Sequence, residues 1–195
     1  MPEPTSTAAT ASAPKVRILA LVVLAIVAVC VYALDQFAKF LVVENLTEGR
    51  SVEVIGDFLQ FYFVKNAGAA FSLGSGSTWI FAILASAVAI FIVVFAPRIH
   101  SLAWAALFGL LLGGNLGNLT DRLFREPGFG VGHVIDFIQI KYFPAIFNVA
   151  DMAIVASMAI FIILTIRGIG LTGKPATTSV EKTPDDVGST PTDAA

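Results

Sequence analysis

Two aspartates lie beside apolar segments, where a membrane protein rarely tolerates a charge. Asp136 lies in the stretch Val-Ile-Asp-Phe at 134–137, and Asp151 lies at the start of an apolar run that ends near residue 166. An ionised carboxylate at the centre of a membrane helix costs roughly 2.5 kcal/mol or more on insertion scales. Two such acids close to the same helix end therefore indicate a carboxylate pair that faces a wet interior and does acid–base work.

A carboxylate pair of this kind favours hydrolysis. Two close carboxyl groups share one proton, because both cannot ionise comfortably. The ionised group can take a proton from water while the protonated group polarises a carbonyl, which is the chemistry of aspartic peptidases. The alternative is structural, with the acids capped or paired with Arg122 or Lys141, and the pattern alone leaves both readings open.

Other catalytic chemistries find little support in the sequence. Ser72 is the best candidate nucleophile, but no base stands at a spacing that ties it to this serine. His100 and His133 are the only histidines, and the chain has neither an HExxH motif nor a cluster of cysteine and histidine. We therefore expect no metal and no cofactor.

The composition indicates a polytopic helical membrane protein. Of 195 residues, 56% are hydrophobic and only 13% are charged, against about a quarter in soluble domains. A bilayer span needs about 20 apolar residues. Four runs reach that length: Ile18 to about Val43, Thr78 to Ala96, about Leu102 to Leu119, and about Phe147 to Ile166. The net charge of −2, with no basic block, argues against a nucleic-acid partner.

Four spans place both termini on one side of the membrane. The basic residues in the short flanks of the runs (Lys15, Arg17, Arg98, Arg167) favour the cytoplasm for that side. The outer loops are then 44–77 and 121–146. The first contains the aromatic stretch 58–64, which predicts a strand at headgroup level, and the second contains the strand-like stretch around Asp136. The expected fold is an all-α polytopic membrane protein with four transmembrane helices and a small extracytoplasmic β-rich subregion.

Most polar residues of the helix ends should gather at one depth on the outer side. Asp35 and Lys39 are four residues apart near the end of the first run, and Asn148 and Asp151 share a helix face. The third run ends in Asn118, Asp121 and Arg122, and its glycines at 109, 113 and 117 should let a neighbouring backbone approach closely. The bundle can thus bring these groups to a single site.

These residues resemble the motifs of the lipoprotein signal peptidase family, also called signal peptidase II. The matching blocks follow the order of that family: Asp35-Gln36-x-x-Lys39, Asn66-x-Gly68-Ala69-Ala70-Phe71-Ser72, Gly117-Asn118-x-x-Asp121-Arg122, Val134-Ile135-Asp136-Phe137 and Phe147-Asn148-x-Ala150-Asp151. Each block is weak alone, and the set is highly specific. The stretch 125–132 looks longer than is common in the family and should lengthen a loop without disturbing the pair of acids.

The resemblance implies an aspartic endopeptidase of the bacterial cytoplasmic membrane, with its active site on the extracytoplasmic side. We expect the protein to be a monomer. The implied substrate is a prolipoprotein that carries diacylglycerol on its cysteine, cut just before that cysteine, and the implied inhibitor is globomycin. Membrane lipids are the other expected partner. By motif, Asp136 and Asp151 are the catalytic residues, and the implied substrate-binding residues are Asp35, Asn66, Gly68, Asn118, Arg122 and Asn148.

Simpler roles remain open for several of these residues. Asp35 with Lys39 can be an ordinary ion pair, Asn66 can cap a turn, and Asn118 and Asn148 can be interhelical hydrogen-bond partners. Two other protein classes are a small transporter or channel subunit, which would carry mid-membrane charges and an inverted repeat, and a membrane scaffold without enzymatic activity. The expected organisation is a disordered tail at 1–14, a membrane peptidase domain at 15–171 and a disordered tail at 172–195.

Overall fold

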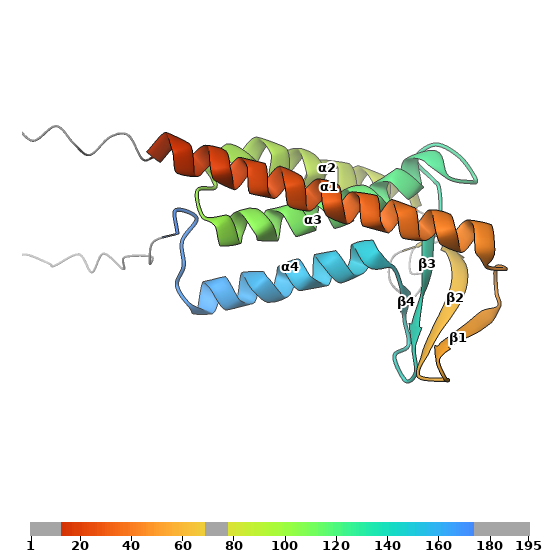
Figure 1. Ribbon diagram of the computed structural model, residues 1–195. Coiled ribbons are helices and arrows are strands. Elements are labelled where there is room, and N and C mark those ends of the chain that lie inside the picture. The colour runs from red at the N-terminus through yellow and green to blue at the C-terminus, as the bar shows by residue number, and fades with distance from the viewer. Residues whose placement is uncertain (1–12, 69–77, 174–195) are drawn as a thin grey trace, which may run out of the picture.

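The computed structural model describes residues 13–68 and 78–173 (Figure 1). The predicted tails fall almost entirely outside this part of the chain, as does Ser72. Within the described part, four helices are long and apolar enough to cross a membrane: α1 Ala13–Asn45, α2 Thr78–Phe95, α3 Leu102–Phe124 and α4 Val149–Ile166. The four predicted spans are confirmed. The helices α2 and α4 have 18 residues each, which at 1.5 Å per residue gives about 27 Å, close to the thickness of a bilayer core.

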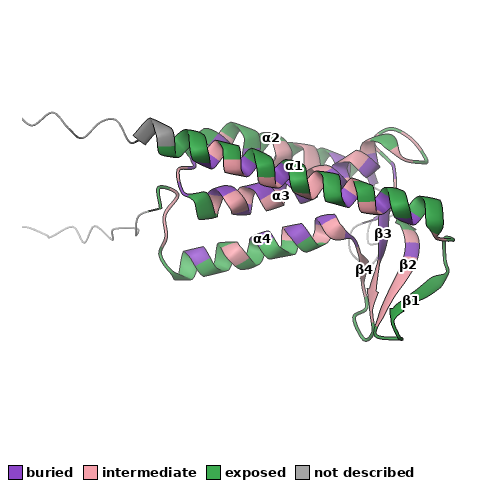
Figure 2. Cartoon of the chain, viewed as in Figure 1, coloured by how far each residue is buried: buried purple, intermediate pink, exposed green. Residues whose placement is uncertain are grey.

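Helix α3 lies at the centre of the bundle and packs against α1, α2 and α4. Half of its membrane-spanning window is buried, whereas most of the outer surface of the other helices is exposed and apolar (Figure 2). The predicted close approach at its glycines is confirmed. A Cβ at Gly109 would lie 2.8 Å from the carbonyl oxygen of Leu24, and one at Gly113 would lie 2.6 Å from that of Ala28. Without side chains at these positions, α1 rests directly on α3.

A four-stranded antiparallel sheet projects from one end of the bundle, across the helix direction (Figure 1). Its strands, in spatial order, are β1 Ser51–Ile55, β2 Leu59–Asn66, β3 Val134–Ile140 and β4 Ile146–Phe147. Strand β2 lies one to two residues beyond the predicted stretch 58–64, and β3 confirms the strand around Asp136. Strand β1 was not predicted, because all five of its residues are exposed and its short pattern gives little indication of burial.

The sheet is fixed to the bundle by a small apolar cluster. Val42 of α1 packs with Phe63 of β2 and with Ile135 and Phe137 of β3, and all four are buried. The odd-numbered residues of β3 thus face α1, so its even-numbered residues, including Asp136, face the other way.

The end of the bundle opposite the sheet carries both ends of the described chain (Figure 1). A three-residue 3₁₀ turn, η3 Ala96–Arg98, begins the connection from α2 to α3. The segment after α4 returns to this connection, since the indole of Trp104 donates to the carbonyl of Ile169 at 2.9 Å and the backbone N–H of His100 donates to that of Leu171 at 3.0 Å. The two termini share a side, as four spans require, and which side is cytoplasmic stays a prediction.

Candidate active site

The first turn of α4 places Asp151. Asn148 is the N-cap of this helix, with extended backbone, and its side-chain oxygen accepts from the backbone N–H of Asp151 at 3.0 Å. In return, the Asp151 carboxylate accepts from the backbone N–H of Asn148 at 3.1 Å. This reciprocal capping box satisfies two donors that a helix start otherwise leaves without partners. It explains why α4 begins at Val149, two residues later than predicted.

Asp136 is placed by the register between β2 and β3. Val64 pairs with Asp136 and Asn66 pairs with Val134, so these four side chains share one face of the sheet. Between Phe61 and Val64 the register shifts, because β2 contains one extra residue there. The bulge turns Asn66 toward Asp136, and its side-chain N–H donates to Asp136 Oδ2 at 2.8 Å.

Two asparagines connect the acids. Asn118 of α3 donates to Asp151 Oδ1 at 2.9 Å. The side chain of Asn148 donates to Asp136 Oδ1 at 2.6 Å and to the side-chain oxygen of Asn118 at 3.1 Å. Because the backbone of Asn148 also binds Asp151, this one residue contacts both acids. Asn118 and Asn148 thus form the hydrogen bond that the sequence left open as a possibility. Each of them also donates to one of the acids.

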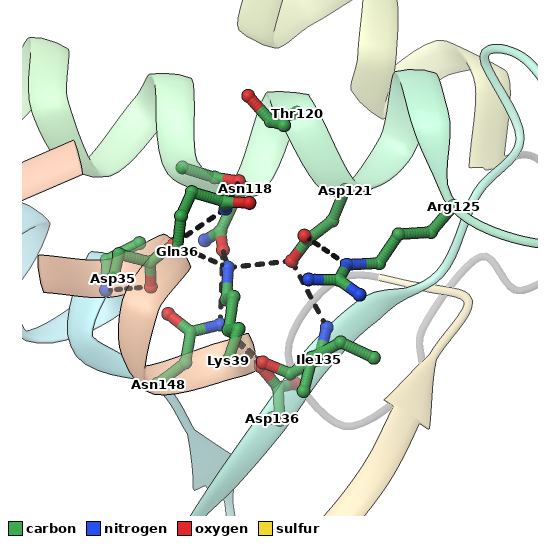
Figure 3. Close-up of polar contacts among 12 residues, drawn as sticks. Asp35, Gln36, Lys39, Asn118, Thr120, Asp121, Arg125, Ile135, Asp136 and Asn148 are labelled. Atoms are coloured by element: carbon green, nitrogen blue, oxygen red, sulfur yellow. Dashed lines mark hydrogen bonds and ion pairs between the residues drawn. The ribbon is translucent and has the colours of Figure 1, made fainter. Parts of the chain in front are cut away.

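A buried ion network around Lys39 adjoins the site (Figure 3). The ammonium of Lys39 lies 2.8 Å from Asp35 Oδ2 and 2.7 Å from Asp121 Oδ2, and all three side chains are fully buried. Lys39 also donates to the side-chain oxygen of Asn118 at 2.9 Å. An amide whose oxygen faces an ammonium must turn its N–H₂ group the other way, so Lys39 fixes Asn118 with its donor toward Asp151.

Asp35 holds the start of α4 from the other side. Its Oδ1 accepts from the backbone N–H of Ala150 at 2.9 Å, while its Oδ2 faces Lys39. A Cβ at Gly117 would lie 2.5 Å from Asp35 Oδ2, so this glycine leaves the space in which the carboxylate lies. Both oxygens of Asp35 are occupied within the protein. Its position therefore supports a structural contribution, and its contact with a substrate stays a prediction.

Arg122 also lines the site. Its Nη2 donates to the carbonyl oxygen of Gly68 at 2.6 Å, and its guanidinium stacks 5.1 Å from the centre of the Phe81 ring. Its Nη1 is buried without a hydrogen-bond partner among the described residues, which is unusual for such a donor. Asp121, its neighbour in the sequence, forms ion pairs with Lys39 and Arg125.

Both acids line one cavity of about 450 Å³. Its polar wall also contains Asn66, Gly68, Asn118 and Arg122, whereas Asp35 and Asn148 lie behind the wall and are fully buried. The remaining wall is apolar and comes from the sheet and the exposed flank of α4: Val134, Ile140, Phe143, Ala145, Ile146, Phe147, Met152 and Val155. The cavity thus joins a carboxylate pair to a surface that continues along a membrane helix.

The electrostatics of Asp136 suit proton transfer near neutral pH. Burial raises the pKa of this carboxyl to about 7, and the nearby charge of Asp151 adds to the effect. The amide donors of Asn66 and Asn148 oppose the rise only in part. An acid with a pKa near the working pH can both hold and release a proton. Among the described residues, no group of three or more histidine, cysteine, aspartate or glutamate side chains is arranged to hold a metal ion.

Sequence reasoning singled out most of this site and missed one important element. Six of the eight predicted residues line the cavity, and Asn148 and Asp35 support it from behind. The element that was missed is the coupling of Lys39 to Asn118, although the charge at position 39 in an apolar run was a visible signal. Nothing in one sequence tells which of several acids a buried lysine will meet.

The fold and the site define a polytopic membrane protein with two acids at one end of the bundle, Asp136 buried and Asp151 half-buried, and such an arrangement is typical of a membrane-bound hydrolase. A family model described as signal peptidase (SPase) II matches residues 27–167. The chain belongs to this family and is an aspartic peptidase. This finding decides against the transporter, channel and scaffold classes.

Relatives and solved structures agree with the family. The lipoprotein signal peptidase of Leifsonia xyli subsp. xyli is 64% identical over 166 residues, covering 85% of this chain and 77% of that protein. The lipoprotein signal peptidase of Streptomyces coelicolor is 50% identical over 147 residues, covering 75% and 72%. A bacterial membrane enzyme solved by the in meso method at 2.3 Å is similar, with a TM-score of 0.66 and 28% identity, covering 84% of this chain and 93% of that one.

Proposed function

We propose that this peptidase removes the signal peptide from diacylglyceryl-modified prolipoproteins, cutting just before the lipidated cysteine, with Asp136 and Asp151 as the catalytic pair. The observation that carries the proposal is the shared cavity, in which both carboxylates lie on one wall and Asn148 contacts both. The family and the names of its relatives support the class of substrate.

One proton is shared by the pair in this mechanism. Asp136, whose pKa burial raises to about 7, holds that proton at the start. Asp151 accepts N–H donors from Asn118 and from the backbone of Asn148 at a helix N-terminus, an arrangement that favours a negative charge. Their surroundings thus assign Asp136 as the protonated acid and Asp151 as the ionised acid. The proton belongs to the pair as a whole, so its titration is a property of both residues.

The reaction then follows from these two states. Ionised Asp151 accepts a proton from water, the water oxygen attacks the scissile carbonyl carbon, and Asp136 gives its proton to the carbonyl oxygen. In the second step the carbon–nitrogen bond breaks, the leaving nitrogen gains a proton from Asp151, and Asp136 recovers a proton from the tetrahedral intermediate as the new carboxyl group forms. The pair returns to its starting state, with one proton.

The neighbouring residues have distinct parts in this proposal. Asn66, Gly68, Asn118 and Arg122 line the cavity and bind the substrate backbone. Asp35, Lys39 and Asn148 act from behind by holding the acids and α4 in place.

The apolar wall of the cavity fits the lipid of the substrate. Met152 and Val155 are 52% and 67% exposed on the outer flank of α4, so the wall continues toward the bilayer. Acyl chains buried there contribute roughly 0.8 kcal/mol per CH₂ group. We further propose that the protein acts as a monomer in the bacterial cytoplasmic membrane, with cytoplasmic termini and an extracytoplasmic site.

The test is cleavage of a lipid-modified precursor by purified enzyme, followed as a gel shift. Asp136→Asn and Asp151→Asn should each insert and fold but show essentially no turnover, because an amide cannot exchange the shared proton. Asp57→Asn, which changes an exposed acid at the tip of the sheet, is the matched control and should cleave normally. Near-normal turnover by either of the first two variants would refute the assignment of the pair.

A further inference from the structure

A second cavity lies behind the catalytic one, on the other face of the ribbon formed by β2 and β3. Its volume is about 410 Å³. Lys65 pairs with Ile135 across the two strands, and both line this second cavity, while Asn66 and Asp136, one residue along, line the first. The proposed peptidase chemistry uses none of the side chains in the second cavity.

The second cavity brings together three nitrogen-bearing side chains, those of Lys65, Arg125 and His133. Lys65 is only loosely neutralised, since its ammonium lies 3.4 Å from Glu126 and 3.6 Å from Glu48, and those acids are 86% and 52% exposed. Exposed ion pairs of this kind contribute little to stability, so a bound anion can replace the acids as the partner of Lys65. Lys65 is therefore available to a bound anion.

Arg125 is held in place with its outer end available. Its Nε lies 2.5 Å from Oδ1 of the fully buried Asp121, whose other oxygen is bound by Lys39 (Figure 3). No hydrogen bond to the two terminal nitrogens of Arg125 is found among the described residues. A guanidinium anchored through Nε presents its terminal N–H groups as a fork, the geometry that suits phosphate oxygens.

The position of this cavity indicates a lipid. Val43 in the last turn of α1 and Phe124 at the end of α3 form part of its lining, and both belong to membrane-spanning helices. Phe124 and Phe129 are 74% and 79% exposed and meet edge to face at 6.3 Å between ring centres. Exposed apolar rings at the end of a membrane-spanning helix form a patch that lipid can cover.

We propose that the second cavity binds the headgroup of an anionic phospholipid with a polyol headgroup, such as phosphatidylglycerol. The phosphate lies between Lys65 and Arg125, with His133 beside it. The Glu126 carboxylate, which also lines the cavity, accepts from the headgroup hydroxyls. The phenylalanines flank the glycerol backbone. Phosphatidylcholine offers the same phosphate, but its quaternary ammonium can meet Glu126 only as a charge and donates no hydrogen bond. A free phosphate makes no use of the aromatic rim.

The experiment measures lipid retention by native mass spectrometry on the full-length protein, delipidated and then given equal amounts of phosphatidylglycerol or phosphatidylcholine. Lys65→Gln should weaken retention of phosphatidylglycerol about fivefold, the effect of losing one basic contact near a membrane surface. Arg125→Gln should do the same. Because Arg125→Gln also disturbs Asp121, Lys65→Gln carries the test. Lys141→Gln is the matched control, since Lys141 pairs with Asp57 at the tip of the sheet, and it should retain the lipid like the parent.

Two results would overturn the proposal. One is equal retention of phosphatidylglycerol by Lys65→Gln and by Lys141→Gln. The other is displacement of the lipid by millimolar inorganic phosphate, which would make this a site for soluble anions. Binding is measured without turnover and can be repeated in Asp136→Asn, so it is independent of the proposed catalytic pair.

Discussion

The raised pKa of Asp136 predicts that this residue makes the folded protein less stable as the pH rises, and that Asp136→Asn removes the effect. Burial raises the pKa from the ordinary value of 3.8 to about 7. Between these values the folded chain keeps a proton that the unfolded chain has released. The stabilising contribution is therefore fully present below about pH 4 and is lost as the pH rises through about 7.

The size of the effect follows from the same two values. At 1.36 kcal/mol per pKa unit, Asp136 changes the free energy of unfolding by on the order of 4 kcal/mol in total. About 3 kcal/mol of this change falls between pH 5 and pH 8. The amide of the variant has no charge to lose, but it turns one N–H₂ hydrogen-bond donor toward the donors of Asn66 or Asn148. That clash costs about 1–3 kcal/mol at every pH. The slope with pH, and not the absolute stability, is therefore the diagnostic quantity.

The assay is thermal unfolding of the detergent-purified protein at pH 5, 6, 7 and 8. A change of 3 kcal/mol corresponds to roughly 6–12 °C in Tm for a chain of this size. Between pH 5 and pH 8, the Tm of the parent should fall by this amount more than the Tm of Asp136→Asn. The Tm of Asp57→Asn should follow that of the parent. If Asp136→Asn keeps the full slope of the parent, the acid is not the proton-holding member of the pair and the reasoning fails.

Three other predictions concern topology, packing and substrate. Reporter fusions after residue 14, at Arg98 and after residue 172 should report the cytoplasm and one within 127–132 the outer side, and an outer signal at Arg98 would contradict this orientation. Gly117→Ala should destabilise the protein by about 1–3 kcal/mol and slow cleavage, because its Cβ would meet Asp35 at 2.5 Å, whereas Gly128→Ala, with nothing closer than 4.0 Å, should be silent in both thermal unfolding and cleavage assays. A precursor without lipid on its cysteine should be cleaved far more slowly than the modified form at equal concentration, and equal rates would remove the lipid from recognition.

The helices and the two acids could be predicted from the sequence, because each depends on a local pattern of residues. A run of about 20 apolar residues is a span whatever its neighbours are. Asp136 and Asp151 stood out because a carboxylate beside such a run is costly. The strand around Asp136 and the glycine contacts between α1 and α3 followed from short-range patterns in the same way.

Contacts between side chains that are distant in the sequence could not be predicted. The sequence did not predict that Asp35 is enclosed by Lys39, Gly117 and the backbone of Ala150. That enclosure depends on how α1, α3 and α4 cross, which hydrophobic periodicity does not specify. The bulge in β2 was equally invisible, because one extra residue in a strand rich in aromatic residues leaves the composition unchanged.

That bulge decides where β2 can change its length without moving the site. Removing one residue between Phe61 and Val64 would restore regular pairing and leave Val64 opposite Asp136 and Asn66 opposite Val134. Removing Lys65 instead, with Val64 held opposite Asp136, would bring Asn66 opposite Ile135, on the face away from Asp136, and Asp136 would lose the amide of Asn66. A deletion of a single codon outside the bulge thus has the chemical effect of a substitution at the active site, whereas a deletion inside the bulge does not. Gene variants in this family should therefore be read by strand length as well as by residue identity.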